Sequence, residues 1–119
     1  MVLHLKRVYD SPNAGDGLRI LVDRLWPRGV KKEIAQLDYW LKDVAPSSEL
    51  RKWFHSGSGT FEDFRSRYLE ELDCRPETKE ALHTLQNLIT QSPVTLLYGS
   101  KDTTNNHAIV LKEWLEKTT

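Results

Sequence analysis

Two short and almost continuous apolar segments constrain the fold of this chain more than any other feature. Residues 18–23 read Leu-Arg-Ile-Leu-Val-Asp, and residues 93–98 read Pro-Val-Thr-Leu-Leu-Tyr. Strands buried on both faces of a parallel sheet have such runs, whereas a strand with one solvent-exposed face alternates between apolar and polar residues. Segments with helical patterns separate the two runs. We therefore predict the α/β fold class, with a mainly parallel sheet of about three or four strands flanked by helices.

The other expected elements follow from periodicity and from turn residues. Residues 2–8 alternate loosely and predict another strand, and residues 10–17 are dense in Pro, Asn and Gly and predict a loop. No long linker divides the chain, so we predict a single domain over residues 1–119, a length typical of one domain. Helices are expected over residues 31–35, 48–54, 61–72, 77–90 and 105–117.

Residues 37–44 fit two structures. Leu37, Tyr39 and Leu41 alternate with polar residues, as in a strand. Leu37, Leu41 and Val44 also fall on one face of a helix. We choose a short strand for this segment.

The chain has no formal net charge, with 17 basic and 17 acidic side chains. This balance argues against a protein that holds nucleic acid chiefly by charge, and against a polybasic membrane adaptor. The balance hides an asymmetry, because residues 1–32 contain seven Lys and Arg against three Asp. The net charge of zero is therefore the sum of a positive N-terminal third and a negative remainder. The excess of Lys and Arg in the N-terminal third needs an explanation.

The number of cysteines and the spacing of histidines indicate which cellular compartment and which cofactors to expect. The single cysteine, Cys74, excludes an intrachain disulfide, and no apolar stretch approaches the ~20 residues of a membrane span. The N-terminal apolar run is too short for a signal peptide, so we expect a cytoplasmic protein. The four histidines lack metal-ligand spacing and no glycine-rich phosphate loop is present, so we expect neither a metal nor a cofactor.

Polar side chains follow each of the three clear strands. Ligands of open α/β sheets bind beyond the carboxyl ends of the strands, so we expect these side chains to lie together near the start of the final helix. Helix N-termini favour anions, and arginine matches the geometry of carboxylate and phosphate. The residues expected to bind an anion are Arg7, Arg24, Arg28 and Lys101. Those expected to line the same site are Tyr9, Asp23, Trp26, Tyr98, Ser100 and Asn106.

Asp102 and His107 are the candidates for catalysis, by orienting a substrate or transferring a proton. A neutral imidazole at the start of the last helix can act as a base. Simpler roles stay open. Asp102 could cap the last helix, and His107 could donate a hydrogen bond to a loop carbonyl. Asp23 could form an internal ion pair with Arg24.

Three classes of function fit these features. The first is a protein that binds an anionic small molecule, including a small enzyme acting on a nucleotide or a phosphorylated metabolite. The second is a nucleic-acid-associated module that uses the basic N-terminal third, and the third is a protein-interaction domain without catalysis.

The cluster of aromatic residues between positions 39 and 68 predicts a helical side core, with a platform for stacking bases as the alternative.

Seven segments together carry a family resemblance. They are Lys-Arg-Val-Tyr-Asp at 6–10, Leu-Val-Asp-Arg-Leu-Trp-Pro-Arg-Gly at 21–29, Trp-Leu-Lys at 40–42, Val-Ala-Pro-Ser at 44–47, Leu-Arg-Lys-Trp-Phe at 50–54, Val-Thr-Leu-Leu-Tyr at 94–98 and Asn-His-Ala at 106–108. In these segments the chain resembles the YeaO-like branch of domain-of-unknown-function family 488. The resemblance covers nearly the whole chain and implies a compact bacterial α/β domain, without implying a reaction. More distant relatives look as though they carry Cys-His-Arg where this chain has Asn106, His107 and Ala108, so cysteine chemistry does not carry over.

Overall fold

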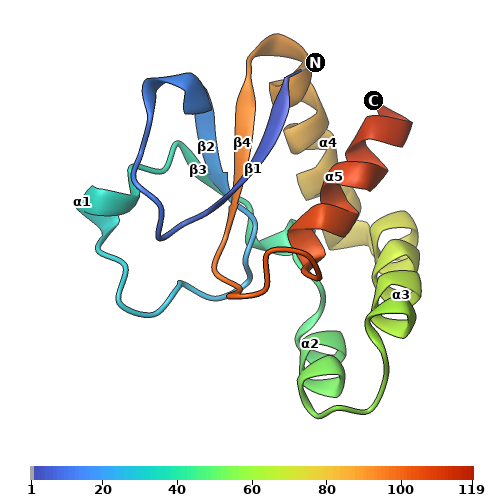
Figure 1. The fold of residues 1–119 in the computed structure, drawn as a ribbon. Coiled ribbons are helices and arrows are strands. Elements are labelled where there is room, and N and C mark those ends of the chain that lie inside the picture. Colours follow the sequence, from blue (N-terminus) through green and yellow to red (C-terminus); the bar gives the residue numbers. More distant parts are fainter. Residues whose placement is uncertain (1) are drawn as a thin grey trace.

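Strand β4 (Val94–Tyr98) lies inside the sheet, and all five of its residues are buried. It pairs in parallel with β1 (Leu3–Arg7) on one side and with β2 (Leu18–Leu21) on the other. The short strand β3 (Tyr39–Trp40) extends β2, which gives the strand order β1-β4-β2-β3 in the described part of the chain. The computed structural model describes residues 2–119 and confirms the predicted α/β class with a parallel sheet (Figure 1).

The helices lie close to their predicted positions. Side chains cap three of them: the Ser47 hydroxyl caps α2, a capping box of Thr60 and Asp63 opens α3, and the side-chain oxygen of Asn106 caps α5. Asn106 therefore holds the capping role that the sequence left open for Asp102. None of the helices between residues 2 and 119 has the length and apolar character of a membrane span. The bounds are α1 (Lys32–Ala35), α2 (Ser48–His55), α3 (Phe61–Cys74), α4 (Pro76–Gln91) and α5 (His107–Thr118).

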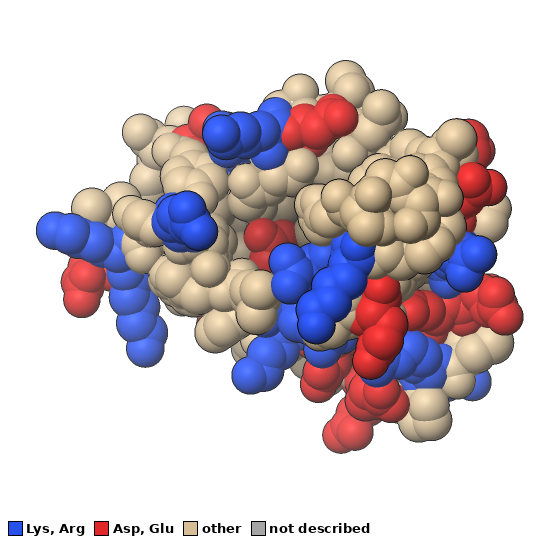
Figure 2. Space-filling view, turned by 90° about the horizontal axis from the view of Figure 1, so that it is seen from below, with Lys and Arg blue, Asp and Glu red and all other residues tan. Residues whose placement is uncertain are grey.

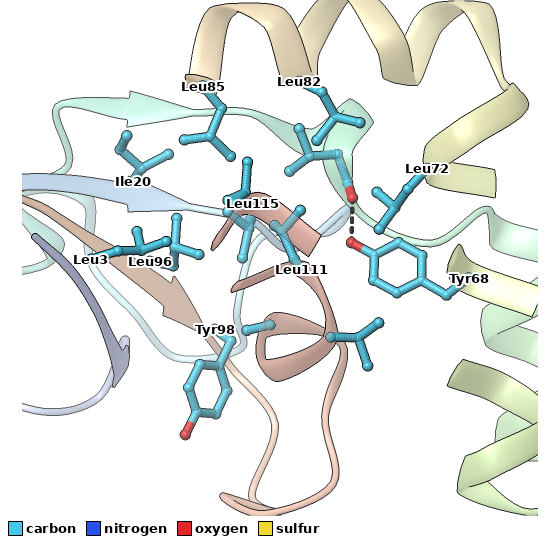
Figure 3. Close-up of a cluster of buried hydrophobic side chains, with 14 of the residues drawn as sticks. Leu3, Ile20, Tyr68, Leu72, Leu82, Leu85, Leu96, Tyr98, Leu111 and Leu115 are labelled. Atoms are coloured by element: carbon cyan, nitrogen blue, oxygen red, sulfur yellow. Dashed lines mark hydrogen bonds between the residues drawn. The ribbon is translucent and has the colours of Figure 1, made fainter. Parts of the chain in front are cut away.

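Successive side chains of β4 point to opposite faces of the sheet, and each face packs against a different layer. Leu96 belongs to the main core, which the sheet shares with α3, α4 and α5 (Figure 3). Leu97 belongs to a smaller cluster on the other face, together with Val8, Leu21 and Ala35 of α1. Both faces of the strand are therefore apolar, which explains why its sequence is continuous instead of alternating.

The aromatic residues of α2 and α3 pack in or against the main core, whereas Tyr39 and Trp40, which the predicted helical side core included, are exposed on β3. Phe54, Phe61, Phe64 and Tyr68 contact one another with ring centroids 4.6 to 6.1 Å apart. Tyr68 is fully buried, and its hydroxyl donates a hydrogen bond to the Val44 carbonyl. Burial raises the pKa of the Tyr68 phenol well above its ordinary value, so this hydroxyl stays a donor.

Residues 37–44 contain a strand and a helical turn in succession. Tyr39 and Trp40 pair with β2, and Lys42–Val44 forms a 3₁₀ turn. The predicted strand over residues 37–44 is therefore right for Tyr39 and Trp40 and wrong for the residues on either side of them. The chain leaves the sheet because Val44 is buried in the main core, where its carbonyl accepts the Tyr68 hydroxyl.

Buried charges lie on the smaller face of the sheet. Arg19 of β2 is only 5% exposed. Its guanidinium donates to the Ala35 carbonyl at 3.0 and 2.8 Å, and to the Asp16 carboxylate at 2.6 Å. Lys6 Nζ lies 3.2 Å from the same carboxylate. Burial alone would raise the pKa of Asp16, but hydrogen bonds from Asn13, Arg19 and Lys6 outweigh it and hold the pKa below its ordinary value.

We predict that Arg19→Met lowers the free energy of unfolding by about 3 kcal/mol, because it removes one partner of a buried ion pair. Urea unfolding followed by circular dichroism measures this loss. Arg28→Met is the matched control at an exposed arginine, and it should change the free energy by less than ~0.5 kcal/mol. Equal effects of the two substitutions would show that the buried guanidinium does not stabilise the fold.

Candidate functional site

The loops that follow β2 and β4 lie side by side because these two strands are neighbours in the sheet. The Asp23 carboxylate joins the loops, since its Oδ2 accepts the Gly99 amide at 2.9 Å. The backbone carbonyl of Asp23 accepts the Trp40 indole N–H at 2.7 Å, which ties β3 to the same arrangement. A Cβ at position 99 would lie 2.9 Å from Asp23 Oδ2, so an alanine there would force this carboxylate to shift.

His107, the first residue of α5, contacts the loop that follows β2. Its Nε2 lies 3.0 Å from the Val22 carbonyl oxygen and 3.2 Å from Asp23 Oδ1. Both neighbours are acceptors, so Nε2 carries the hydrogen and Nδ1 carries the lone pair of the neutral ring. The hydrogen bond from His107 to a loop carbonyl is therefore present, and Asp23 lies against His107 instead of pairing with Arg24.

Arg24 points toward the segment that precedes α2. Its Nε donates to the Pro46 carbonyl at 3.0 Å, and its Nη2 donates to the Ala45 carbonyl at 3.2 Å. Its Nη1 lies 3.6 Å from the half-exposed Asp43 carboxylate. These contacts hold the start of α2 against the loop that follows β2.

A cavity of about 300 Å³ lies between these loops, α2, α3 and the start of α5. Figure 2 views the molecule from the side of these loops, and it shows a hollow with Lys and Arg side chains beside it and an acidic side chain within it. Among the described residues that line the cavity, Asp23 is the one acid. The predicted site residues in the lining are Asp23, Arg24, Ser100, Lys101, Asn106 and His107.

The helical side of the cavity is absent from the sequence prediction. Arg51, Phe54 and His55 of α2 line it together with Phe64 of α3. Positions i, i+3 and i+4 share one face of a helix, and this spacing of the three α2 residues is the signal that could have identified them. The remaining lining residues are Leu25, Ala45, Pro46 and Asn105.

Arg51 differs from the other arginines near the cavity. Within residues 2–119 its guanidinium has no hydrogen bond and no ion pair, and its buried Nε has no partner. Arg24, in contrast, donates to two backbone carbonyls and lies near a carboxylate. Most buried polar groups in proteins are satisfied, so the open donor of Arg51 needs an explanation.

Three predicted residues surround the cavity without lining it. Arg7 Nε donates to the Ser100 carbonyl at 2.9 Å, and its guanidinium stacks over the Tyr9 ring. The Tyr9 hydroxyl donates to the Arg28 carbonyl at 2.8 Å, while the Arg28 side chain is exposed. These bonds tie the loop after β4, and the turn that contains Arg28, to the end of β1.

Trp26, Tyr98 and Asp102 also lie outside the lining. Trp26 packs in the smaller core cluster, and Tyr98 is buried in the main core. The exposed Asp102 carboxylate accepts the amides of Asn105 and Thr104 and the Thr104 hydroxyl, and these hydrogen bonds lower its pKa below the ordinary value. No group of three or more His, Cys, Asp and Glu side chains in residues 2–119 is arranged to hold a metal ion.

The fold and the cavity define an α/β protein whose parallel sheet carries a cationic and partly aromatic cavity at the carboxyl ends of its strands. The chain belongs to the DUF488 family, because the family model DUF488-N3i, described as "Inactive DUF488-N3 subclade", matches residues 2–119. This membership confirms the resemblance that the sequence motifs predict.

Bacterial relatives match over nearly their whole lengths. The Escherichia coli protein named "Uncharacterized protein YeaO" is 48% identical over 115 residues, which cover 97% of this chain and 97% of that protein. The Mycobacterium tuberculosis protein named "Uncharacterized protein Rv3073c" is 41% identical over 113 residues, which cover 95% of this chain and 92% of that protein. No solved structure matches the chain significantly.

We predict that Gly99→Ala lowers the free energy of unfolding by about 1–3 kcal/mol, because the added methyl group would collide with the Asp23 carboxylate. Gly99 is not among the described glycines with positive φ, so backbone strain does not contribute. Urea unfolding measures the change. Ser100→Ala is the neighbouring control, and we expect it to cost less than ~1 kcal/mol because its hydroxyl accepts one exposed amide. Parent-like stability of Gly99→Ala would show that the Asp23 bond does not hold the two loops together.

Proposed function

We propose that the cavity binds a small anionic molecule. Arg51 carries this proposal, because its guanidinium lines the cavity and its buried Nε has no partner within residues 2–119. A buried donor without an acceptor costs about 1–3 kcal/mol, and an anion that supplies the acceptor would remove this cost. The planar guanidinium offers two parallel donors that match a carboxylate or a phosphate.

The other charges around the cavity support an anionic ligand. Lys101, from the loop after β4, joins Arg51 in the lining. Arg24 is partly offset by Asp43 at 3.6 Å, so Arg51 and Lys101 supply most of the unpaired charge. Asp23, the one acidic residue among the described lining residues, accepts the Gly99 amide at Oδ2, and its Oδ1, which has no hydrogen bond within residues 2–119, lies 3.2 Å from His107 Nε2. A concave site with an excess of one sign of charge concentrates ligands of the opposite sign.

The start of α5 contributes a dipole and an imidazole. His107 lies in the first turn of this helix, where the partial positive charge of the backbone favours anions. Its Nε2 hydrogen is donated to the Val22 carbonyl, so Nδ1 is the ring atom left for a ligand. In the neutral ring Nδ1 accepts a hydrogen bond, which suits an anion that also bears a hydroxyl or N–H group.

Binding without turnover fits this chain better than catalysis. Asp102, one of the two predicted catalytic residues, is exposed, and its carboxylate holds its own loop instead of lining the cavity. Residues 106–108 lack the cysteine and the arginine that the resemblance gives to more distant relatives. The description of the matched family model contains the word "inactive". In this proposal His107 belongs to the binding surface, and its catalytic role stays a prediction.

Titration with sodium phosphate, followed by isothermal titration calorimetry, tests the proposal. We expect saturable binding, and we expect Arg51→Gln to raise the Kd at least tenfold, because a hydrogen bond to a charged group contributes about 1.5–3 kcal/mol. Lys52→Gln makes the same change of charge at the adjacent exposed residue, and its Kd should stay within about twofold of the parent. Equal loss in both variants, or no binding of phosphate, sulfate or acetate, would contradict the proposal.

A further inference from the structure

The cavity has an apolar side that an inorganic anion would leave in contact with water. Apolar groups gain free energy when they are removed from water, so this side favours a ligand with an apolar part. The apolar residues of the lining are Leu25, Ala45, Pro46, Phe54 and Phe64.

The aromatic part of this lining is held rigidly. The rings of Phe54 and Phe64 contact each other with centroids 4.6 Å apart, and Phe61 and Tyr68 extend the cluster behind them. Phe64 and Tyr68 are buried, so the cluster is packed on its inner side. A wall that is already packed does not have to rearrange to meet a flat ring, and the binding cost of ordering side chains is correspondingly small.

Helix α2 presents charge and ring on the same face. Arg51 and Phe54 are three residues apart and both line the cavity. The start of this helix is fixed, because the Ser47 amide and hydroxyl donate to the two carboxylate oxygens of Glu71 at 2.8 and 2.6 Å. The helix backbone that carries Arg51 and Phe54 is therefore held in place, so one wall of the cavity offers a charged side chain beside a ring, which suits a ligand with a charged end and a flat end.

The cavity volume limits the size of this ligand. Pockets for small molecules span about 300–1,000 Å³. The volume here, about 300 Å³, lies at the lower end of that range. One ring with one small charged group suits such a volume, whereas a dinucleotide would extend far into solvent.

We infer that the ligand is a single planar aromatic ring that carries one anionic group. The anionic group lies at Arg51 and Lys101, and the ring packs against Phe54 and Phe64. This inference rests on the proposed function, because it names the class of anion that the same cavity takes.

Calorimetric titrations with phenyl phosphate, cyclohexyl phosphate, inorganic phosphate and benzoate test the inference. We expect phenyl phosphate or benzoate to bind at least tenfold more tightly than inorganic phosphate, and phenyl phosphate to bind more tightly than its non-planar cyclohexyl analogue. Whichever of the two aromatic anions binds more tightly identifies the charged group as phosphate or carboxylate. Phe54→Leu should remove the advantage of the aromatic anions, whereas Phe61→Leu should keep it, because Phe61 belongs to the cluster without lining the cavity.

The outcomes separate this inference from the proposed function. Binding of inorganic phosphate that depends on Arg51, without any gain from a ring, would overturn the aromatic ligand and keep the anion site. Absence of binding by every probe would overturn both. Nuclear Overhauser effects between phenyl phosphate and the rings of Phe54 or Phe64 are measured on the unaltered protein, so the test holds even if Phe54→Leu does not fold. No such effect at saturation would also overturn the inference.

Discussion

The pairing of β4 between β1 and β2 sets the positions of the other parts of the molecule. A strand covered on both faces cannot shift by one residue without moving every apolar side chain to the wrong layer. This register places Tyr98 opposite Arg7 and Leu97 opposite Leu21, so the chain leaves the three strands at one edge of the sheet. Because α5 is the next element after β4 in the chain, the start of that helix, the loop after β2 and the cavity all lie at this edge.

Four of the seven basic side chains in the N-terminal third contact other parts of the fold, whereas Arg28, Lys31 and Lys32 are exposed. Lys6 and Arg19 form ion pairs with the Asp16 carboxylate, and Arg7 donates a hydrogen bond to the Ser100 carbonyl. These charges hold loops and strands together instead of forming a basic surface. Most of the unpaired charge at the cavity comes from Arg51 and Lys101, which both lie outside that third. The count of charges along the sequence therefore found side chains that stabilise the fold, whereas the arginine that carries the proposed site is identified in the structure by its missing partner.

The strands could be predicted because burial on both faces leaves a continuous apolar pattern that is local in sequence. Asp23 and His107 could be placed at one edge because parallel strands end together. Arg51 and Phe54 could not be placed, because α2 reaches the cavity only through its docking on α3 and through backbone contacts of the segment before it. The Arg28 side chain is exposed, and its carbonyl accepts a hydrogen bond from Tyr9, just after β1, a contact that no local pattern encodes. The single domain and the cytoplasmic location stay predictions.

The four-residue helix α1 has a consequence for how the molecule folds and opens. A helix of this length does not form alone, because one turn fixes several dihedral angles for a single hydrogen bond. Its last residue, Ala35, is held from outside the helix by the two hydrogen bonds from Arg19. The turn is therefore stabilised by its contacts with β2, through Arg19 and through the packing of Ala35 against Leu21. Hydrogen exchange in residues 32–35 is then governed by local opening of this contact with β2, and not by fraying of an independent helix.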